Sequence, residues 1–238
     1  NTDGMISGDQ VRDYCKAHWA DGSHEHVVQP GLVYISYPTE SGTLYSKAQL
    51  EDLSAACKEW NLPLFIDGAR LGYGLTSPAC DMTLQELAAL CDVFYIGGTK
   101  CGALFGEAVV ITNPGLKRDF RYSIKRHGGM LAKGRLLGIQ YETLFTDNLY
   151  FEICRQAVSY ALEIRNAFAE KGVPVFGTSR TNQQFVELTD AQRAAFDGKF
   201  AYEVWGAGEH GGTVVRFCTS WATTRENVDA LLNTIAAL

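Results

Sequence analysis

Two side chains of opposite charge follow predicted strands and could act on one ligand. Asp67 comes directly after the apolar run 62–66, and Lys100 follows the apolar run 93–96 by four residues. Ligands of open α/β sheets bind beyond the carboxyl ends of the strands, so we expect both side chains at a binding edge. Their separation in the sequence fits one strand–helix–strand crossover, which predicts that they lie on neighbouring strands.

A buried carboxylate and a buried ammonium group are costly unless each is paired, so the two indicate either a structural ion pair or a bound group that needs both. Pyridoxal phosphate needs this combination: a lysine for its Schiff base and a carboxylate beside its pyridine nitrogen. Gly97 and Gly98 would allow a close backbone approach to it, and the Thr99 hydroxyl could donate to its phosphate. The alternatives are a surface loop around Lys100 and an ordinary Asp-Gly turn at Asp67. A P-loop is excluded, because its G-x-x-x-x-G-K-[ST] spacing is absent here.

Two arginines are candidates for binding a carboxylate. Arg70 follows Asp67 by three residues and could point over the same edge. Arg216 lies inside the apolar run 214–218, where a planar guanidinium group needs a buried anion such as an amino-acid carboxylate. The alternatives are a solvated charge at a helix start for Arg70, and a structural ion pair or an outward-facing position for Arg216.

The elements that must position these residues alternate in the first part of the chain. The apolar periodicity predicts helices at 7–20, 46–60 and 83–90 and strands at 31–36, 62–66, 93–96 and 108–112. A long helical region spans 130–171, with a break near Asp147 and Asn148. After Gly172 the pattern predicts strands at 173–176, 184–188, 200–204 and 213–219 and helices at 190–196 and 224–238. We therefore expect an α/β cofactor-binding domain with a mainly parallel sheet at 1–147 and a smaller α+β domain at 148–238.

The composition narrows the class of partner. The 238 residues are 46% hydrophobic and 20% charged, and the net charge is 21 − 27 = −6, which argues against nucleic acid or an anionic membrane as the main partner. No apolar run approaches the roughly 18 residues that span a bilayer, and no signal peptide is visible. The seven cysteines form no C-x-x-C pair, so we expect neither a disulfide framework nor a metal site, and we expect a cytoplasmic setting.

The combined pattern resembles the fold-type I pyridoxal-phosphate enzymes, most closely the threonine aldolase and β-eliminating lyase family. The resemblance rests on FIDGARLGYG at 65–74 and DVFYIGGTKCGALFGEAVVI at 92–111. Members of the family carry an Asp-Gly-Ala-Arg segment after a strand and a Ser- or Thr-Lys segment in a glycine-rich loop. Three further segments match in the same order along the chain: ISYPTESGTLYS at 35–46, HGGMLAKGR at 127–135 and VVRFCTSWAT at 214–223.

The resemblance implies a role for each candidate residue. Lys100 would be the Schiff-base lysine, and Asp67 would be the partner of the pyridine nitrogen. Thr99 and Arg70 would contact the cofactor, and Arg70 and Arg216 would bind the carboxylate of an amino-acid substrate. The implied reaction is lyase cleavage of a threonine-like β-hydroxy-α-amino acid to glycine and an aldehyde. β-Elimination from an amino acid is one alternative, and an inactive fragment or non-catalytic scaffold is another.

The resemblance also implies further parts of the site. Family members carry a phosphate-binding glycine-rich loop and a ring-stacking aromatic or histidine before the matched region. Because the sequence opens at Asn1 without a methionine, we expect a fragment that lacks them. Fold-type I sites are commonly built between subunits, so we expect a homodimer or homotetramer. The basic cluster, defined as Lys125, Arg126, His127 and Lys133, would bind phosphate across that interface or form an exposed helix start. We also expect Thr39 and Glu40 near the same sheet edge, where they could orient the cofactor or the substrate.

Overall fold

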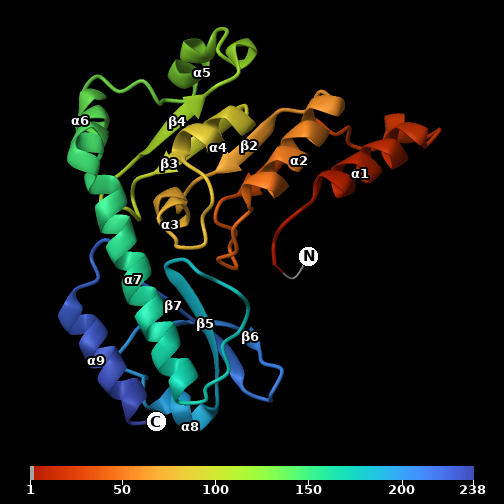
Figure 1. The fold of residues 1–238 in the computed structure, drawn as a ribbon. Helices are drawn as coiled ribbons and strands as arrows, with labels where there is room; N and C mark the ends of the chain where they lie inside the picture. The colour runs from red at the N-terminus through yellow and green to blue at the C-terminus, as the bar shows by residue number, and fades with distance from the viewer. Residues whose placement is uncertain (1–2) are drawn as a thin grey trace.

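The computed structural model describes residues 3–238, and Asn1 and Thr2 lie outside the described residues. The chain forms two sheets (Figure 1). The first has four strands in the order β1-β2-β3-β4, and the second has three strands in the order β5-β7-β6. Within the described part, every helix is too short or too polar to cross a membrane.

The first sheet is mainly parallel. Its strands are β1 (Val33–Ser36), β2 (Leu64–Asp67), β3 (Val93–Gly97) and β4 (Glu107–Ile111), of which only β4 runs antiparallel to its neighbour. The helices of this part are α1 (Gly8–Ala20), α2 (Lys47–Glu59), α3 (Leu71–Leu75) and α4 (Leu84–Leu90), with a short 3₁₀ turn at His24–His26. Capping boxes at Ser46 and Thr83 start α2 and α4. The strand residues whose side chains point into the core are Val33, Ile35, Leu64, Ile66, Phe94 and Ile96.

A chain of helices connects the two sheets. They are α5 (Phe120–Arg126), α6 (Arg135–Phe145) and α7 (Leu149–Glu170), with 3₁₀ turns at Pro114–Leu116 and Thr146–Asn148. Asp147 and Asn148 have left-handed φ angles of 51° and 61°, which end α6 and redirect the chain. The helix break predicted at these two residues is therefore confirmed. Helix α5 was not predicted.

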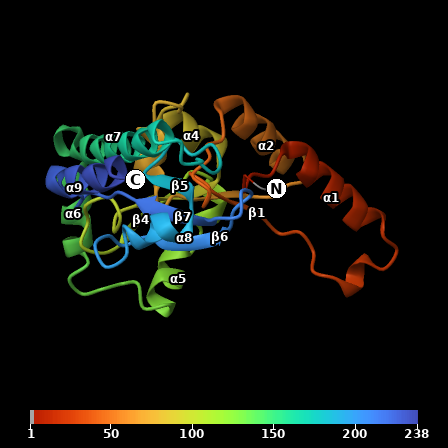
Figure 2. The same cartoon turned by 90° about the horizontal axis from the view of Figure 1, so that it is seen from below.

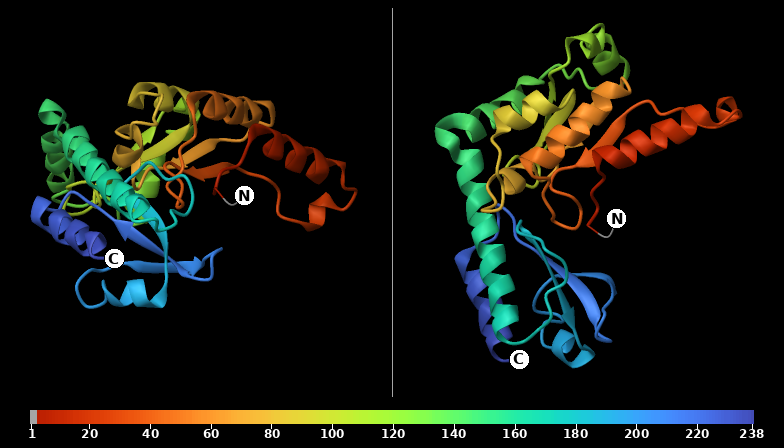
Figure 3. Two further views of the ribbon diagram at one scale, coloured as in Figure 1. Left: turned by 60° about the horizontal axis from the view of Figure 1, so that its bottom comes forward. Right: turned by 45° about the vertical axis from the view of Figure 1, so that its right-hand side comes forward.

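The second sheet is antiparallel and packs on α7. It consists of β5 (Gln183–Leu188), β6 (Glu203–Ala207) and β7 (Thr213–Cys218), and α8 (Asp190–Ala194) and α9 (Arg225–Ala236) complete this part. Helix α7 runs from one sheet to the other (Figure 3). It places Cys154 and Ala157 in the core of the first sheet and Ile164 and Phe168 in the core of the second.

Two strand predictions in the second half are wrong. Segment 173–176 makes only an isolated bridge between Val175 and Val186. Pro174 has no N–H for a ladder, and Gly177 turns the chain away with a φ of 70°. The strand predicted at 200–204 begins only at Glu203.

The predicted apolar face of the first helix is half wrong. Val11 and Cys15 are buried, but Tyr14 is 63% exposed and Trp19 is 46% exposed. The reason is the position of α1, which packs along α2 at its start and then extends away from the body of the molecule (Figure 2). The periodicity therefore identified the helix but not how much of it is covered.

Candidate active site

Asp67 ends β2 in a setting that favours the carboxylate. It accepts a hydrogen bond from the hydroxyl of Tyr34 at 2.5 Å and from the backbone N–H of Ala69 at 2.9 Å. Partial burial raises the pKa of Asp67, but hydrogen bonds from Tyr34, Tyr95 and Ala69 and the charge of Lys100 lower it further than burial raises it. The net pKa lies below the ordinary value, so Asp67 is ionised at neutral pH.

The loops that follow β2 and β3 touch each other. The N–H of Gly97 donates to the carbonyl of Gly68 at 2.9 Å. A Cβ on Gly97 would lie 2.3 Å from the carbonyl oxygen of Ala69, and one on Gly98 would lie 2.4 Å from the hydroxyl of Tyr141. Glycine is thus required at both positions by the protein's own backbone and side chains, whereas the sequence interpretation explained it by the approach of a cofactor.

Lys100 lies in the loop after β3, with an exposed side chain among three carboxylates. Partial burial raises the pKa values of Asp67, Glu40 and Glu107, and the charge of Lys100 acts in the opposite direction on all three. Lys100 is therefore close enough to interact electrostatically with Asp67. The structure thus brings the two candidate residues to the same edge of the sheet, Asp67 at the end of β2 and Lys100 in the loop that follows the neighbouring strand β3.

Three tyrosines hold the backbone at the end of β3 and in the lysine loop, defined as residues 98–106. The hydroxyl of Tyr73 donates to the carbonyl of Lys100, and that of Tyr150 donates to the carbonyl of Gly97 at 3.0 Å. The hydroxyl of Tyr141 donates to a carbonyl of β3 at 2.9 Å. Burial raises the pKa of each tyrosine, so all three stay protonated donors at neutral pH. Helices α3, α6 and α7 each supply one of them, which fixes the loop from three directions.

Glu40 lies between the two predicted carboxylate-binding arginines. Its Oε1 is 2.5 Å from Nη1 of Arg216, and its Oε2 is 3.1 Å from Nη1 of Arg70. Arg70 precedes α3 at the edge of the first sheet, whereas Arg216 lies in the middle of β7. Partial burial raises the pKa of Glu40, but the two guanidinium groups bring it below the ordinary value. One carboxylate therefore joins the two sheets.

Arg216 has further partners on the helix-free face of the second sheet. It is 8% exposed, donates to Gln183 Oε1 at 2.8 Å, and forms a second ion pair with Glu203. Its guanidinium carbon lies 5.0 Å from the ring centroid of Trp205. Burial lowers the pKa of Arg216, and the bonds to Glu40 and Glu203 raise it above the ordinary value. The structural ion pair considered from the sequence is present, and the substrate-binding role of Arg216 stays a prediction.

Other predicted positions are placed less centrally. The Thr99 side chain is exposed, and its contact with a phosphate stays a prediction. The Thr39 hydroxyl is used inside its own turn, where it bonds with the hydroxyl of Thr43 at 2.5 Å. The basic cluster begins in the last turn of α5 and continues after it, and α5 lies beyond the end of β4 that pairs with Val93, the opposite end of the sheet from Lys100 (Figure 1). The structure does not bring α5 to the lysine loop.

Sequence reasoning missed the tyrosines around Asp67. Tyr34 pairs with Phe65 and therefore shares the sheet face of Asp67, two residues further along β2. The register that pairs Phe65 with Val93 puts Tyr95 beside Asp67 on that face as well. Counting alternate residues along the three predicted parallel strands could have identified both donors. The bridging geometry of Glu40 has no such signal, because it depends on a loop between sheets.

The chain resembles known proteins in sequence and in fold. A family model described as "Beta-eliminating lyase" matches residues 1–195. The low specificity L-threonine aldolase of Pseudomonas aeruginosa is 30% identical over 211 residues, which cover 88% of this chain and 60% of that protein. The protein of the same name from a Pseudomonas species is 30% identical over 216 residues, covering 90% and 61%. The chain thus spans about three fifths of the length of these relatives.

Solved structures that resemble this chain belong to the same class of protein. A threonine aldolase of Leishmania major superposes with a TM-score of 0.93 at 40% identity, covering 100% of this chain and 68% of that one. A putative L-allo-threonine aldolase of Listeria monocytogenes shares the fold, with a TM-score of 0.66 at 19% identity over 99% of this chain and 66% of that one. The architecture is the mainly parallel α/β fold of the type I pyridoxal-phosphate enzymes, and the predicted fold class is confirmed. The chain belongs to the beta-eliminating lyase family, as its sequence motifs indicated.

Proposed function

We propose that the protein is a pyridoxal-phosphate-dependent lyase that cleaves a threonine-like β-hydroxy-α-amino acid to glycine and an aldehyde. The observation that carries this proposal is that Asp67 ends β2 and Lys100 follows the neighbouring parallel strand β3, at the same edge of the sheet and close enough to interact electrostatically. The names of the relatives from Pseudomonas and Leishmania support the choice of substrate.

The residues present fit the cofactor. Asp67 is ionised at neutral pH and would hold the proton on the pyridine nitrogen. Lys100 has an exposed amine at the same edge and would attach the cofactor covalently. Thr99 lies beside Lys100, where its hydroxyl could donate to the phosphate. When bound, pyridoxal phosphate supplies an electron sink for the bond that breaks.

The chain's own residues would bind and orient the substrate. Arg70 and Arg216 approach from the two sheets and would bind its carboxylate, which would orient the bond that breaks relative to the cofactor ring. Tyr73 donates to the carbonyl of Lys100, and Tyr150 and Tyr141 donate to carbonyls at the end of β3, just before the lysine loop. These bonds would hold the backbone of Lys100 in place before substrate arrives.

β-Elimination is the second candidate, because the matching family model bears that description. It would use the same lysine and aspartate and break a different bond. Incubating the protein with pyridoxal phosphate and threonine tests the two: aldol cleavage yields glycine and acetaldehyde, whereas β-elimination yields a keto acid and ammonia. Formation of glycine is expected. Absence of both product pairs, with no visible absorbance from bound cofactor, would favour a non-catalytic scaffold.

We further propose that residues 1–147 act as the cofactor-binding domain and 148–238 as a small domain. The two hydrophobic cores support a division into two parts, although Cys154 and Ala157 of α7, beyond residue 147, belong to the first core. We propose a cytoplasmic homodimer or homotetramer, whose assembly sedimentation analysis would test. The exposed basic cluster is the surface that would bind phosphate across the subunit interface.

A further inference from the structure

The carboxylate of Glu40 is bound as a ligand would be. Each of its oxygens contacts a different arginine, Oε1 with Arg216 and Oε2 with Arg70. Among residues 3–238, it is the one carboxylate with an ion pair to both guanidinium groups. A substrate carboxylate held by both arginines would have to occupy this same position.

The two arginines differ from Glu40 in exposure. The side chains of Arg216 and Arg70 are 9% and 15% exposed, whereas that of Glu40 is 59% exposed. A buried guanidinium group needs an anion, because removing its partner leaves an uncompensated charge. The Glu40 carboxylate, in contrast, regains water when it turns away, because more than half of its side chain already faces solvent. The arginines thus require an anion in the site, but the structure does not require that anion to be Glu40.

Arg216 also has unused hydrogen-bonding capacity. Its Nε is buried and has no hydrogen-bond partner among the described residues. Buried donors without a partner are uncommon in native proteins, and each calls for an explanation. The Nη atoms of Arg216 are paired with Glu40 and Glu203, and its Nε is free to donate. The guanidinium group can therefore bind a carboxylate in a position different from the one that Glu40 takes.

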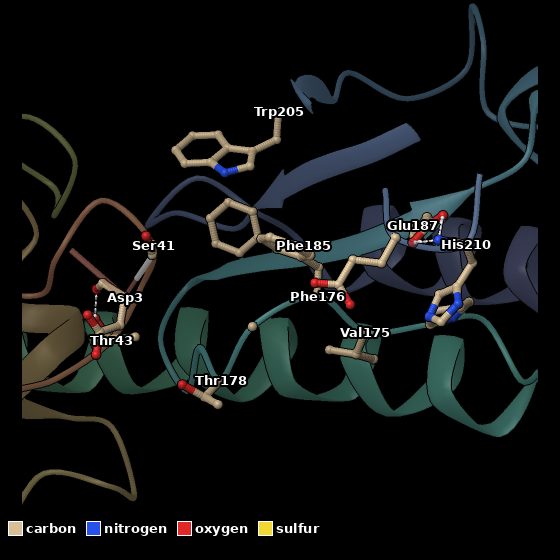
Figure 4. A pocket seen from close by; sticks show the side chains of 13 residues that line it. Asp3, Ser41, Thr43, Val175, Phe176, Thr178, Phe185, Glu187, Trp205 and His210 are labelled. Carbon is tan, nitrogen blue, oxygen red and sulfur yellow. Dashed lines mark hydrogen bonds between the residues drawn. The ribbon is translucent and has the colours of Figure 1, made fainter. Parts of the chain in front are cut away.

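Residues next to Glu40 and Arg216 line a cavity. It has a volume of about 370 Å³ and is lined by Ser41, Phe185 and Trp205, among others (Figure 4). Ser41 follows Glu40 in the chain, and Trp205 lies over the guanidinium group of Arg216. Glu40 and Arg216 do not line the cavity themselves, so the room for Glu40 to move is on the solvent side, where 59% of its side chain is exposed.

We infer that Glu40 is an internal competitor that occupies the substrate-carboxylate site between Arg70 and Arg216 until a substrate displaces it. This inference rests on the proposed function, since that function supplies an amino-acid substrate. Glu40 is then a residue that determines specificity. A ligand with a carboxylate replaces both ion pairs that it breaks, whereas an amine without a carboxylate leaves Glu40 in place.

The test compares the wild-type protein with Glu40→Gln. Acetate is the probe, because it has a carboxylate and no amine that could react with the cofactor. Isothermal titration calorimetry is expected to show acetate binding at least about fivefold more tightly to Glu40→Gln, since the two ion pairs of Glu40 no longer compete with it. The KM for threonine should fall by a similar factor, because substrate no longer has to displace an internal carboxylate.

Glu203→Gln is the matched control. Glu203 contacts Arg216 but not Arg70, so its removal lowers the local negative charge without opening the position between the two arginines. The gain in acetate affinity should be clearly smaller than for Glu40→Gln. Glu40→Asp keeps the charge on a shorter side chain. This variant should bind acetate with an affinity between those of wild type and Glu40→Gln. It tests the inference if Glu40→Gln fails to fold.

Two results would overturn the inference. One is an acetate affinity that is unchanged or weaker in Glu40→Gln and Glu40→Asp. The other is tighter acetate binding with an unchanged KM for threonine, which would mean that substrate binds elsewhere. If the wild-type protein forms no glycine at all, the proposed function fails, and the acetate titration still reports separately whether Glu40 blocks the arginines.

Discussion

The two sheets deliver charged side chains to the site in different ways. The first sheet is mainly parallel, and it presents Asp67 and Lys100 where β2 and β3 end. The second is antiparallel, and it presents Arg216 from the middle of β7, on the face opposite to α7 and α9. A parallel sheet thus concentrates loop residues at one edge, whereas an antiparallel sheet presents a side chain through strand register.

This difference explains what the sequence could predict. The two strand ends were visible as apolar runs followed by Asp-Gly and Gly-Gly-Thr-Lys, and the crossover rule placed them side by side. Arg216 could be recognised as an arginine in an apolar strand, but its partners could not. They come from β6, from β5 and from a loop after β1, and only the folded chain brings these together.

The largest effect on activity is expected from removing Lys100, which the first sheet presents to the site. Lys100→Ala is expected to lower the rate of glycine formation by at least about a thousandfold and to abolish the visible absorbance of bound pyridoxal phosphate, because no amine remains to attach the cofactor. Lys117→Ala, which removes an exposed lysine outside the site, is the control. A variant at position 100 that kept a tenth of the activity would contradict the assignment.

The second sheet can be weakened through its core. Phe168 on α7 is fully buried, and its ring lies 5.8 Å from that of Phe196 and 5.5 Å from that of Phe217. Phe168→Ala should lower the free energy of unfolding by about 3–5 kcal/mol, measured by urea denaturation, because it leaves a cavity among aromatic rings. Phe120→Ala on α5, at a site 37% exposed, should cost much less. Equal losses for the two variants would show that the core of the second sheet does not depend on Phe168.

A smaller effect is expected from removing the Tyr34 hydroxyl, which donates to Asp67 in the first sheet. The Tyr34 hydroxyl stabilises the ionised form of Asp67, so Tyr34→Phe should raise the pKa of Asp67. The acid limb of the pH–rate profile should therefore move to higher pH, while the rate at neutral pH stays within about threefold, because Tyr95 and Ala69 still donate. Tyr122→Phe, at an exposed tyrosine of α5, should leave the limb in place. A shift to lower pH would contradict the role of Tyr34 as a donor.

The remaining gaps between sequence and structure have physical causes. The apolar pattern identified α1, but it could not show that this helix is covered along only part of its length. The break at Asp147 and Asn148 was predictable, because both residue types tolerate a left-handed conformation. The tyrosines that hold the lysine loop come from α3, α6 and α7, and no local pattern links those helices to the loop.

We expect Lys100 to bind the cofactor covalently, with Asp67 beside it. Reduction of the cofactor-loaded protein with borohydride, followed by proteolysis and peptide mass spectrometry, tests this directly. We predict that the pyridoxyl group is found on the peptide containing Lys100, and that Asp67→Asn reduces the labelled fraction. Labelling at another lysine, or none under conditions in which cofactor is bound, would contradict the account.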